Sequence, residues 1–156
     1  MKKVLKIILA ILLFIFIAIQ FYQPALNVDK GQVYTADFSK VYTVPPNVQN
    51  ILQNACYDCH SNNTNNVWYS NIQPMAWLMK KHIDNGKEQL NFSEFGSFSS
   101  RRQISKLRAI ANQIKDEEMP LGSYKIMHRN AQLSKEQKSL LMNWMNKKAD
   151  SLSTEN

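Results

Sequence analysis

The chain contains 156 residues, of which 19 are basic, 12 are acidic and only two are cysteines. A chain of this length accommodates one small domain together with an anchor segment. Three of the basic residues and none of the acidic ones fall in residues 1–22, which leaves 16 basic against 12 acidic residues, a net charge of +4. This mild surplus does not indicate a nucleic-acid-binding protein, which would need a basic patch or stripe.

Residues 1–22 are predicted to form an N-terminal transmembrane anchor. The segment 4–21 is apolar at all but two of its 18 positions, and a helix of that length spans about 27 Å, close to the hydrocarbon thickness of a bilayer. Lys2, Lys3 and Lys6 lie at its start, so the positive-inside rule leaves the N-terminus in the cytoplasm. A cleaved signal peptide begins in a similar way, but this segment ends without a small-x-small site. We therefore favour an uncleaved anchor, with the rest of the chain outside the cytoplasm.

Residues 23–44 are expected to form a tether, because they contain Pro24 and Gly31 and show no sustained periodicity. The domain is predicted to extend over residues 45–149. Its first helix starts near Pro46, since proline is tolerated in the first helical turn. Apolar residues then recur on one face of this helix, at Val48, Ile51, Leu52 and Ala55. The helix leads directly into the two cysteines.

The cysteines belong to the motif Cys56-Tyr57-Asp58-Cys59-His60, which has the C-x-x-C-H spacing of a c-type haem attachment site. Residues three apart lie on the same side of a helical turn, so the two sulfurs can reach one edge of a porphyrin. The thiols would add to its two vinyl groups, and the imidazole of His60 would become the proximal ligand of the iron. The motif therefore predicts one covalently attached haem c.

Other interpretations of the cysteine pair have weaker support. Thioredoxin-like redox proteins also carry C-x-x-C, but in a βαβ context that the flanking sequence lacks. A structural zinc site needs four ligands, and the chain has no second cysteine pair. A disulfide between Cys56 and Cys59 would close too small a loop to stabilise the fold much. Covalent haem is favoured, with zinc or redox chemistry as the alternatives.

Aromatic and soft side chains follow the motif. Trp68 and Tyr69 come after a polar loop and could cover a porphyrin edge, although ordinary core packing explains them equally well. A second helix is predicted from Pro74 to about Asn85, with Gly86 as its C-terminal stop. One face of this helix carries Met75, Leu78, Met79, His82 and Ile83. A methionine stripe of this kind more often belongs to a core than to a metal site.

Two further helices complete the predicted domain. The third spans residues 100–115, and its buried face carries Ile104, Leu107, Ile110 and Ile114. Outside that face lie the basic residues Arg101, Lys106 and Arg108. They form either a solvated surface or a docking patch for an acidic redox partner. The last helix begins at Ser134 with a capping box closed by Gln137, and residues 150–156 are expected to be a polar tail.

The ligand opposite His60 decides what a bound haem could do. Met119 is followed by Pro120, which stiffens the turn after the third helix. A methionine sulfur in such a loop suits a high-potential electron carrier. His82 or His128 would instead give a bis-imidazole site of lower potential, and an open position is a third possibility. We predict Met119 as the distal ligand and keep the two histidines as alternatives.

A recognisable pattern of residues extends well beyond the cysteines. It runs through Asn54 to Asn62, Trp68 to Pro74, Trp77, His82, Gly86, Leu90 to Glu94, Met119-Pro120, Tyr124, His128 and Trp144. Over residues 45–148 this pattern resembles the small haem-binding domain proteins, with Phe95 standing where that family tends to have tryptophan. The resemblance implies an all-α, cytochrome c-like domain with one haem, carried on a bacterial membrane anchor. It implies no particular reaction, because function must be argued from the site.

Together these observations predict a membrane-anchored monohaem c-type cytochrome of the bacterial inner membrane, which exchanges electrons with a redox protein in the periplasm. The alternative is a haem peroxidase-like enzyme or sensor, which requires an open or displaceable sixth ligand. The carrier is favoured because Met119 can supply a sulfur ligand and no distal acid–base pair is evident in the sequence. A haem-free structural or zinc-binding module is the weakest of the three hypotheses.

Overall fold

The structure is a computed structural model that describes residues 1–65 and 67–154. Over these residues the chain forms helices and no strands, which confirms the predicted all-α class. The α-helices are α1 (Lys2–Gln20), α2 (Phe38–Val41), α3 (Pro46–Ala55), α4 (Tyr57–His60), α5 (Met75–Gln89), α6 (Ser100–Lys115), α7 (Gly122–Met127) and α8 (Lys135–Thr154). Short 3₁₀ helices are η1 (Trp68–Asn71), η2 (Phe92–Ser97) and η3 (Arg129–Ala131).

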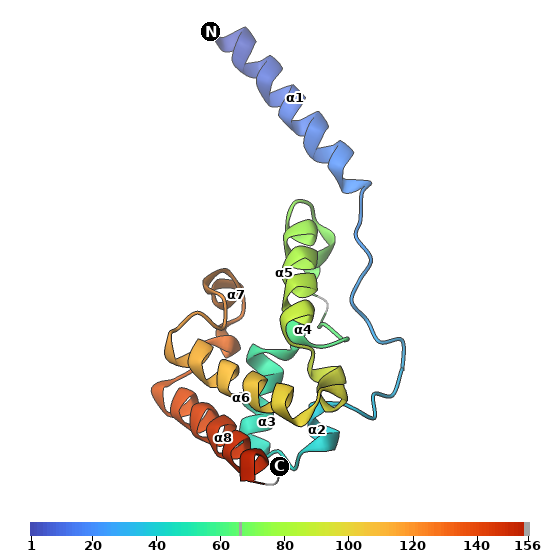
Figure 1. Cartoon of the computed structure of the whole chain (residues 1–156). Helices are drawn as coiled ribbons and strands as arrows, with labels where there is room; N and C mark the ends of the chain where they lie inside the picture. The colour runs from blue at the N-terminus through green and yellow to red at the C-terminus, as the bar shows by residue number, and fades with distance from the viewer. Residues whose placement is uncertain (66, 155–156) are drawn as a thin grey trace.

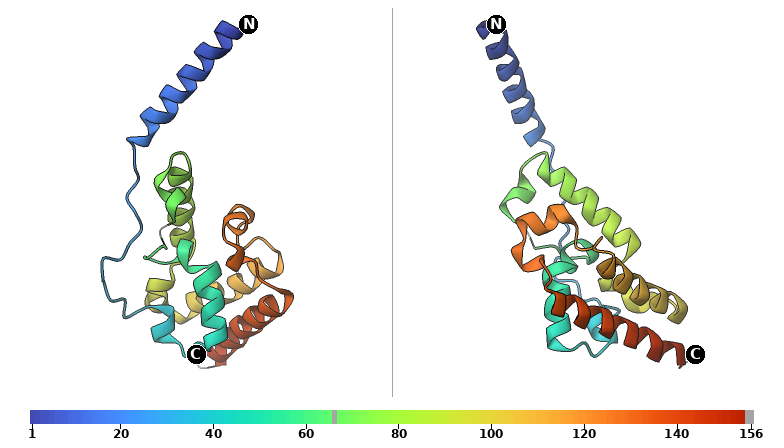
Figure 2. Two further views of the ribbon diagram at one scale, coloured as in Figure 1. Left: turned by 180° about the vertical axis from the view of Figure 1, so that it is seen from behind. Right: turned by 90° about the vertical axis from the view of Figure 1, so that its left-hand side faces the viewer.

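The N-terminal helix α1 projects away from the rest of the chain, which folds as a helical domain (Figure 1, Figure 2). None of the side chains of α1 is buried. The helix is long and apolar enough to cross a membrane, and an N-terminal signal sequence can meet the same criteria of length and hydropathy. The structure thus confirms the apolar N-terminal helix that the sequence predicts.

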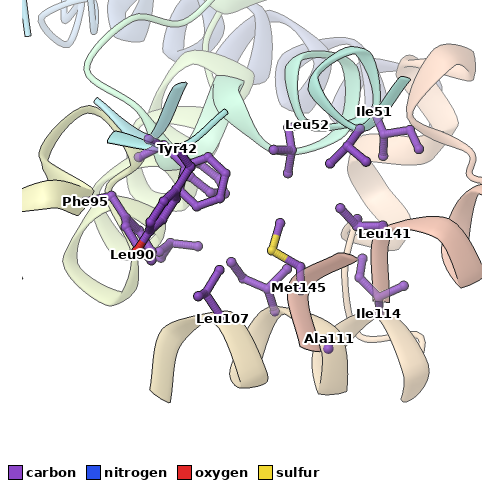
Figure 3. Packing of buried hydrophobic residues seen from close by; sticks show 14 of the residues in the cluster. Tyr42, Ile51, Leu52, Leu90, Phe95, Leu107, Ala111, Ile114, Leu141 and Met145 are labelled. Atoms are coloured by element: carbon purple, nitrogen blue, oxygen red, sulfur yellow. The ribbon is translucent and has the colours of Figure 1, made fainter. Parts of the chain in front are cut away.

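The core of the domain lies where α3, α6 and α8 meet (Figure 3). α6 and α8 pack against each other, and α3 contacts α8. The buried side chains there are Ile51 and Leu52 from α3, Leu107, Ala111 and Ile114 from α6, and Leu141 and Met145 from α8. Each large apolar side chain buried in this way contributes about 1.5–3 kcal/mol relative to its exposed state. The periodicity of α3 and α6 therefore predicted most of their buried side chains correctly, whereas Ile104 is only partly buried.

The segment expected to be a tether also contributes to this core. Asp37 caps α2, because its carboxylate accepts a hydrogen bond at 2.9 Å from the N–H group two residues on. Phe38 is fully buried, and its ring meets the rings of Phe92 and Phe95 edge-on at centroid distances of 5.2 and 4.9 Å. The expectation of a tether over residues 23–44 is therefore incomplete, since part of that segment packs as core.

The predicted helix bounds hold for α3 and α6 and differ for α8. At the start of α8 the capping box is present: Ser134 N–H donates to Gln137 Oε1 at 2.9 Å, and Gln137 N–H donates to Ser134 Oγ at 3.2 Å. The helix then continues to Thr154, into the stretch expected to be a polar tail. Leu152 packs against the core, and this contact extends the apolar face of α8 beyond the predicted end.

The helix α5 also runs past its predicted end. Gly86 was expected to stop it, but α5 continues through this residue to Gln89. Gly86 instead lies where α5 packs on α4, and a Cβ built on it would lie 2.6 Å from the carbonyl oxygen of Cys59. A side chain at this position would collide with that backbone. The glycine is thus a packing feature, and it allows α5 to lie directly against the cysteine motif.

Candidate functional site

The cysteine motif forms a single helical turn at the end of α3. The carbonyl oxygen of Cys56 accepts hydrogen bonds from the N–H groups of Cys59 at 3.2 Å and of His60 at 3.0 Å. Both thiols are free and partly buried. Burial raises the pKa of Cys56 to about 12 and that of Cys59 to about 11. Both groups are therefore neutral thiols at pH 7, positioned on one turn.

The ring of His60 is held by two backbone carbonyls of the neighbouring segment. Its Nδ1 lies 2.8 Å from Gly86 O and 3.0 Å from Leu90 O. Carbonyl oxygens only accept hydrogen bonds, so Nδ1 must carry the proton and Nε2 keeps its lone pair. Burial lowers the pKa of His60, against the opposing effect of the two carbonyls. The residue is thus a neutral imidazole with Nε2 available for a metal, and its partners fix the ring as second-shell groups commonly do.

Two aromatic rings stabilise the turn from the side of the core. Tyr57 and Phe92 stack with a centroid distance of 4.9 Å and an interplanar angle of 3°. Phe92 also meets the His60 ring edge-on, at 6.4 Å and 79°. Because Phe92 is fully buried, it couples the position of the motif to the hydrophobic core.

A cavity of about 270 Å³ opens beside the motif. Residues far apart in sequence line it, among them Cys56, His60, Phe92, Lys106, Ile110 and Met119. The structure thus brings together the predicted proximal ligand, one predicted attachment cysteine and the predicted distal ligand. Most of the wall is apolar, which suits a porphyrin ring.

A second, smaller cavity of about 50 Å³ lies on the side of Cys59. It is lined by Tyr69 and by both alternative distal ligands, His82 and His128. The hydroxyl of Tyr69 lies 2.9 Å from Nε2 of His128. Trp68, predicted to cover a porphyrin edge, lines neither of these cavities and is 73% exposed. The two alternative histidines and Met119 therefore face different spaces.

A buried carboxylate inside the motif was not singled out from the sequence. Asp58 accepts hydrogen bonds from Asn65 N–H at 3.0 Å and from the Tyr124 hydroxyl at 2.6 Å. Burial, and then the bond to Asp58, raise the pKa of Tyr124. This pair ties the cysteine turn to α7, a helix that the sequence analysis also missed. The only sequence signal was an acidic residue between two cysteines, which does not identify its partner.

Gly86, Leu90 and Lys106 were also not assigned to the site from sequence. Their roles come from backbone atoms or from placement at a cavity wall, which side-chain patterns do not reveal. Among residues 1–65 and 67–154, no group of three or more His, Cys, Asp or Glu side chains could hold a metal ion by itself. The donor set that is present consists of two thiols and one imidazole on a single turn beside an apolar cavity. That set fits a haem, which brings its own four nitrogen ligands.

An all-helical domain with these features defines a haem-binding protein. A family model described as a haem-binding domain matches residues 14–147, so the chain belongs to the haem-binding domain family. Searches of curated proteins and of solved structures return no match. The family assignment confirms the resemblance that the sequence analysis identified, and it supports haem as the cofactor.

Proposed function

We propose that this protein is a membrane-anchored monohaem c-type cytochrome that transfers electrons outside the cytoplasm. The observation that carries the proposal is the state of His60. Two carbonyls hold its Nδ1–H, which leaves the lone pair on Nε2, and His60 lines a cavity that Cys56 and Met119 also line. This is the arrangement that an axial ligand of a covalently attached haem requires.

Cys56 and Cys59 supply the covalent attachment in this proposal. Each thiol would add across one vinyl group of the haem: a carbon–sulfur bond would form and the thiol hydrogen would go to the other vinyl carbon, so no oxidant would be consumed. Burial raises the pKa of both thiols, so both carry their protons at pH 7 in this fold. Attachment therefore relies on orientation by the turn, and in the cell on a system that presents the haem.

Met119 is proposed as the distal ligand because it lines the same cavity as His60, whereas His82 and His128 line the other one. With His60 and Met119 as its two protein ligands, a bound haem would supply the one-electron chemistry of an electron carrier and would have no open position for a substrate. Sulfur ligation favours the ferrous state and raises the potential. The apolar wall of the cavity acts in the same direction, since it disfavours the extra charge of ferric iron.

Lys106 gives the cavity a basic group. Haem carries two propionate carboxylates, and an ammonium group at the cavity wall can pair with one of them. From the sequence alone, Lys106 is predicted to belong to a solvated face or to a docking patch. We propose that it contacts the cofactor, while Arg101 and Arg108 remain candidates for binding an acidic redox partner.

The proposed location follows from α1. If α1 is retained as an anchor, Lys2, Lys3 and Lys6 keep its N-terminus in the cytoplasm and the haem domain faces the periplasm of the bacterial inner membrane. Haem c is attached outside the cytoplasm, so the location and the cofactor support each other. The two arguments use different residues and are independent.

The test is to express the full chain with a c-type haem attachment system and to examine the denatured protein for bound haem. We expect the haem to stay with the polypeptide in the wild type and to be lost in the Cys56→Ser/Cys59→Ser double variant. Haem that stays bound in the denatured double variant would overturn covalent attachment. Binding of carbon monoxide to the untreated reduced protein would overturn the closed, six-coordinate site and favour the peroxidase-like or sensor alternative.

A further inference from the structure

The end of α1 is bound to the haem domain by hydrogen bonds. Oε1 of Gln20 accepts from Gln73 N–H at 2.9 Å, and Nε2 of Gln20 donates to Gln73 O at 3.3 Å. The side chain of Gln73, only 4% exposed, donates in turn to Tyr22 O at 2.6 Å. The last residues of α1 and the segment just before α5 therefore form one connected unit.

The chain after α1 continues along the domain instead of leaving it. Nε2 of Gln23 donates to Asn71 O at 3.2 Å. Nδ2 of Asn27 donates to Ser61 O at 2.8 Å, and Lys87 Nζ donates to Oδ1 of Asn27 at 2.8 Å. Bonds at residues 20, 22, 23 and 27 leave little slack between α1 and the domain. The domain is held beside the point at which α1 ends.

Exposed apolar side chains gather around this junction. Trp68 is 73% exposed, Ile72 37% and Trp77 57%. They belong to η1, to the residues after it and to the first turn of α5, which lie at the end of the domain nearest α1 (Figure 1, Figure 2). None of the three lines either cavity beside the cysteine motif. The exposure of these three side chains is therefore separate from the two cavities.

The neighbouring residues have the chemistry of a membrane–water interface. Phe21 and Tyr22, at the end of α1, are 88% and 70% exposed. Lys81 lies on α5 with its Nζ 6.0 Å from the ring centre of Trp77. Tryptophan and tyrosine concentrate at the headgroup level of a bilayer, and a nearby lysine attracts anionic headgroups.

We propose that Trp68, Ile72 and Trp77 insert into the headgroup region of the leaflet from which α1 emerges. The proposal rests on the anchoring role of α1 in the proposed function. When α1 spans the bilayer, Phe21 lies at the outer interface, and the bonds through Gln73 hold the three apolar residues beside it. The occupant of this surface is then the bilayer itself. The haem domain sits on the membrane in one fixed orientation instead of swinging on a tether.

The proposal can be tested with the full, haem-loaded chain in nanodiscs of phosphatidylethanolamine and phosphatidylglycerol. The photo-crosslinking amino acid p-benzoylphenylalanine replaces Trp68 or Trp77, and in a control variant it replaces Lys147. Lys147 is exposed and lies on α8, at the other end of the domain from α1 (Figure 1). After irradiation, mass spectrometry identifies what is attached. We expect phospholipid adducts at positions 68 and 77 and none at position 147.

Each other outcome overturns a defined part of the proposal. Absence of lipid adducts at 68 and 77, in a protein that stays in the nanodisc with its haem spectrum, overturns membrane docking and leaves the proposed function intact. An adduct to a second copy of the chain would show that this surface is a dimer interface and does not contact the bilayer. A chain that does not stay in the nanodisc overturns the anchor, and docking with it. Equal lipid labelling at 147 means that the domain has no fixed orientation.

A second measurement assigns the effect to the two tryptophans. The photo-crosslinker is placed at Ile72, in the wild-type background and in the Trp68→Ser/Trp77→Ser background. If the two rings hold this surface in the headgroup region, lipid adducts at residue 72 decrease several-fold in the second background. Unchanged labelling would show that the bonds through Gln73 alone position the loop and that the two rings do not insert.

Discussion

The backbone of Gly86 lies so close to that of Cys59 that a Cβ on residue 86 would approach the Cys59 carbonyl oxygen to 2.6 Å and the carbonyl carbon to 3.2 Å. The same glycine offers its own carbonyl to Nδ1 of His60 at 2.8 Å. One residue of α5 therefore sets both the spacing between α5 and the motif and the tautomer of the proposed proximal ligand. Its role depends on the absence of a side chain.

We predict that Gly86→Ala destabilises the protein by about 1–3 kcal/mol, because the colliding atoms are backbone and cannot rotate away. A helix-interior alanine would normally be favoured over glycine by roughly 0.5–1 kcal/mol. Gly122→Ala is the matched control, since a Cβ there meets nothing within 4 Å. Urea unfolding of the haem-loaded proteins measures both changes. Equal effects of the two substitutions would show that the close contact does not matter.

We predict that Met119→Ala keeps the covalent haem but loses the far-red absorption band that methionine-ligated ferric haem shows, and that its midpoint potential falls. The reason is that a sulfur ligand from Met119, as proposed, would stabilise ferrous iron. Met127→Ala is the control, because Met127 lines the other cavity and faces neither His60 nor Met119 there. If Met119→Ala leaves the spectrum unchanged and His128→Ala or His82→Ala alters it, a histidine is the distal ligand.

We predict that Tyr124→Phe reduces stability by about 1.5–3 kcal/mol, the range for a hydrogen bond to a charged group. The variant leaves one oxygen of the buried Asp58 carboxylate without its donor at 2.6 Å. Tyr34→Phe serves as the comparison, because its hydroxyl donates to the nearby, exposed Gln32 at 3.2 Å. The loss should be measured by chemical denaturation with haem bound. A similarly small effect in both variants would mean that α7 is not held through Asp58.

We predict that Phe38→Ala costs about 3–5 kcal/mol, the usual cost of removing a buried phenylalanine side chain. Phe38 belongs to the segment first expected to be a tether, and it contacts the Phe92 ring that orients the motif. Val33→Ala, at a position 80% exposed, should change stability by less than about 0.5 kcal/mol. Thermal unfolding distinguishes the two. Near-equal melting temperatures of the two variants would show that residues 23–44 only link α1 to the domain and do not contribute to its core.

The helices that sequence periodicity described well are the ones whose apolar residues recur every three to four positions. α3 and α6 have the predicted bounds, and the residues of their predicted faces are buried apart from Ile104, which is partly buried. Local signals failed where tertiary contacts decided the outcome. Gly86 resembled a helix stop, but it lies inside α5 because the Cys59 backbone packs there. Phe38 had no periodic neighbours, so the sequence did not show that it completes an aromatic cluster.

The residues of the candidate site also fall into those that local sequence predicted and those that depend on tertiary contacts. Its cysteines and His60 are adjacent in sequence, so their spacing alone predicted a haem turn. Distal ligands come from distant parts of the chain, and the sequence could only rank Met119 ahead of His82 and His128. The fold separates these candidates, because it places Met119 on the cavity of His60 and the two histidines on the other.

What the sequence determined by itself was local: an apolar N-terminal helix, amphipathic helices, and a C-x-x-C-H turn in a chain of the haem-binding domain family. Only the tertiary structure decided which carbonyls hold His60, which candidate ligand lines the same cavity, and how Gln73 fixes the domain to the end of α1. The physical reason is that backbone carbonyls are chemically the same at every residue. Which of them becomes a partner depends on packing between segments that are remote in the sequence.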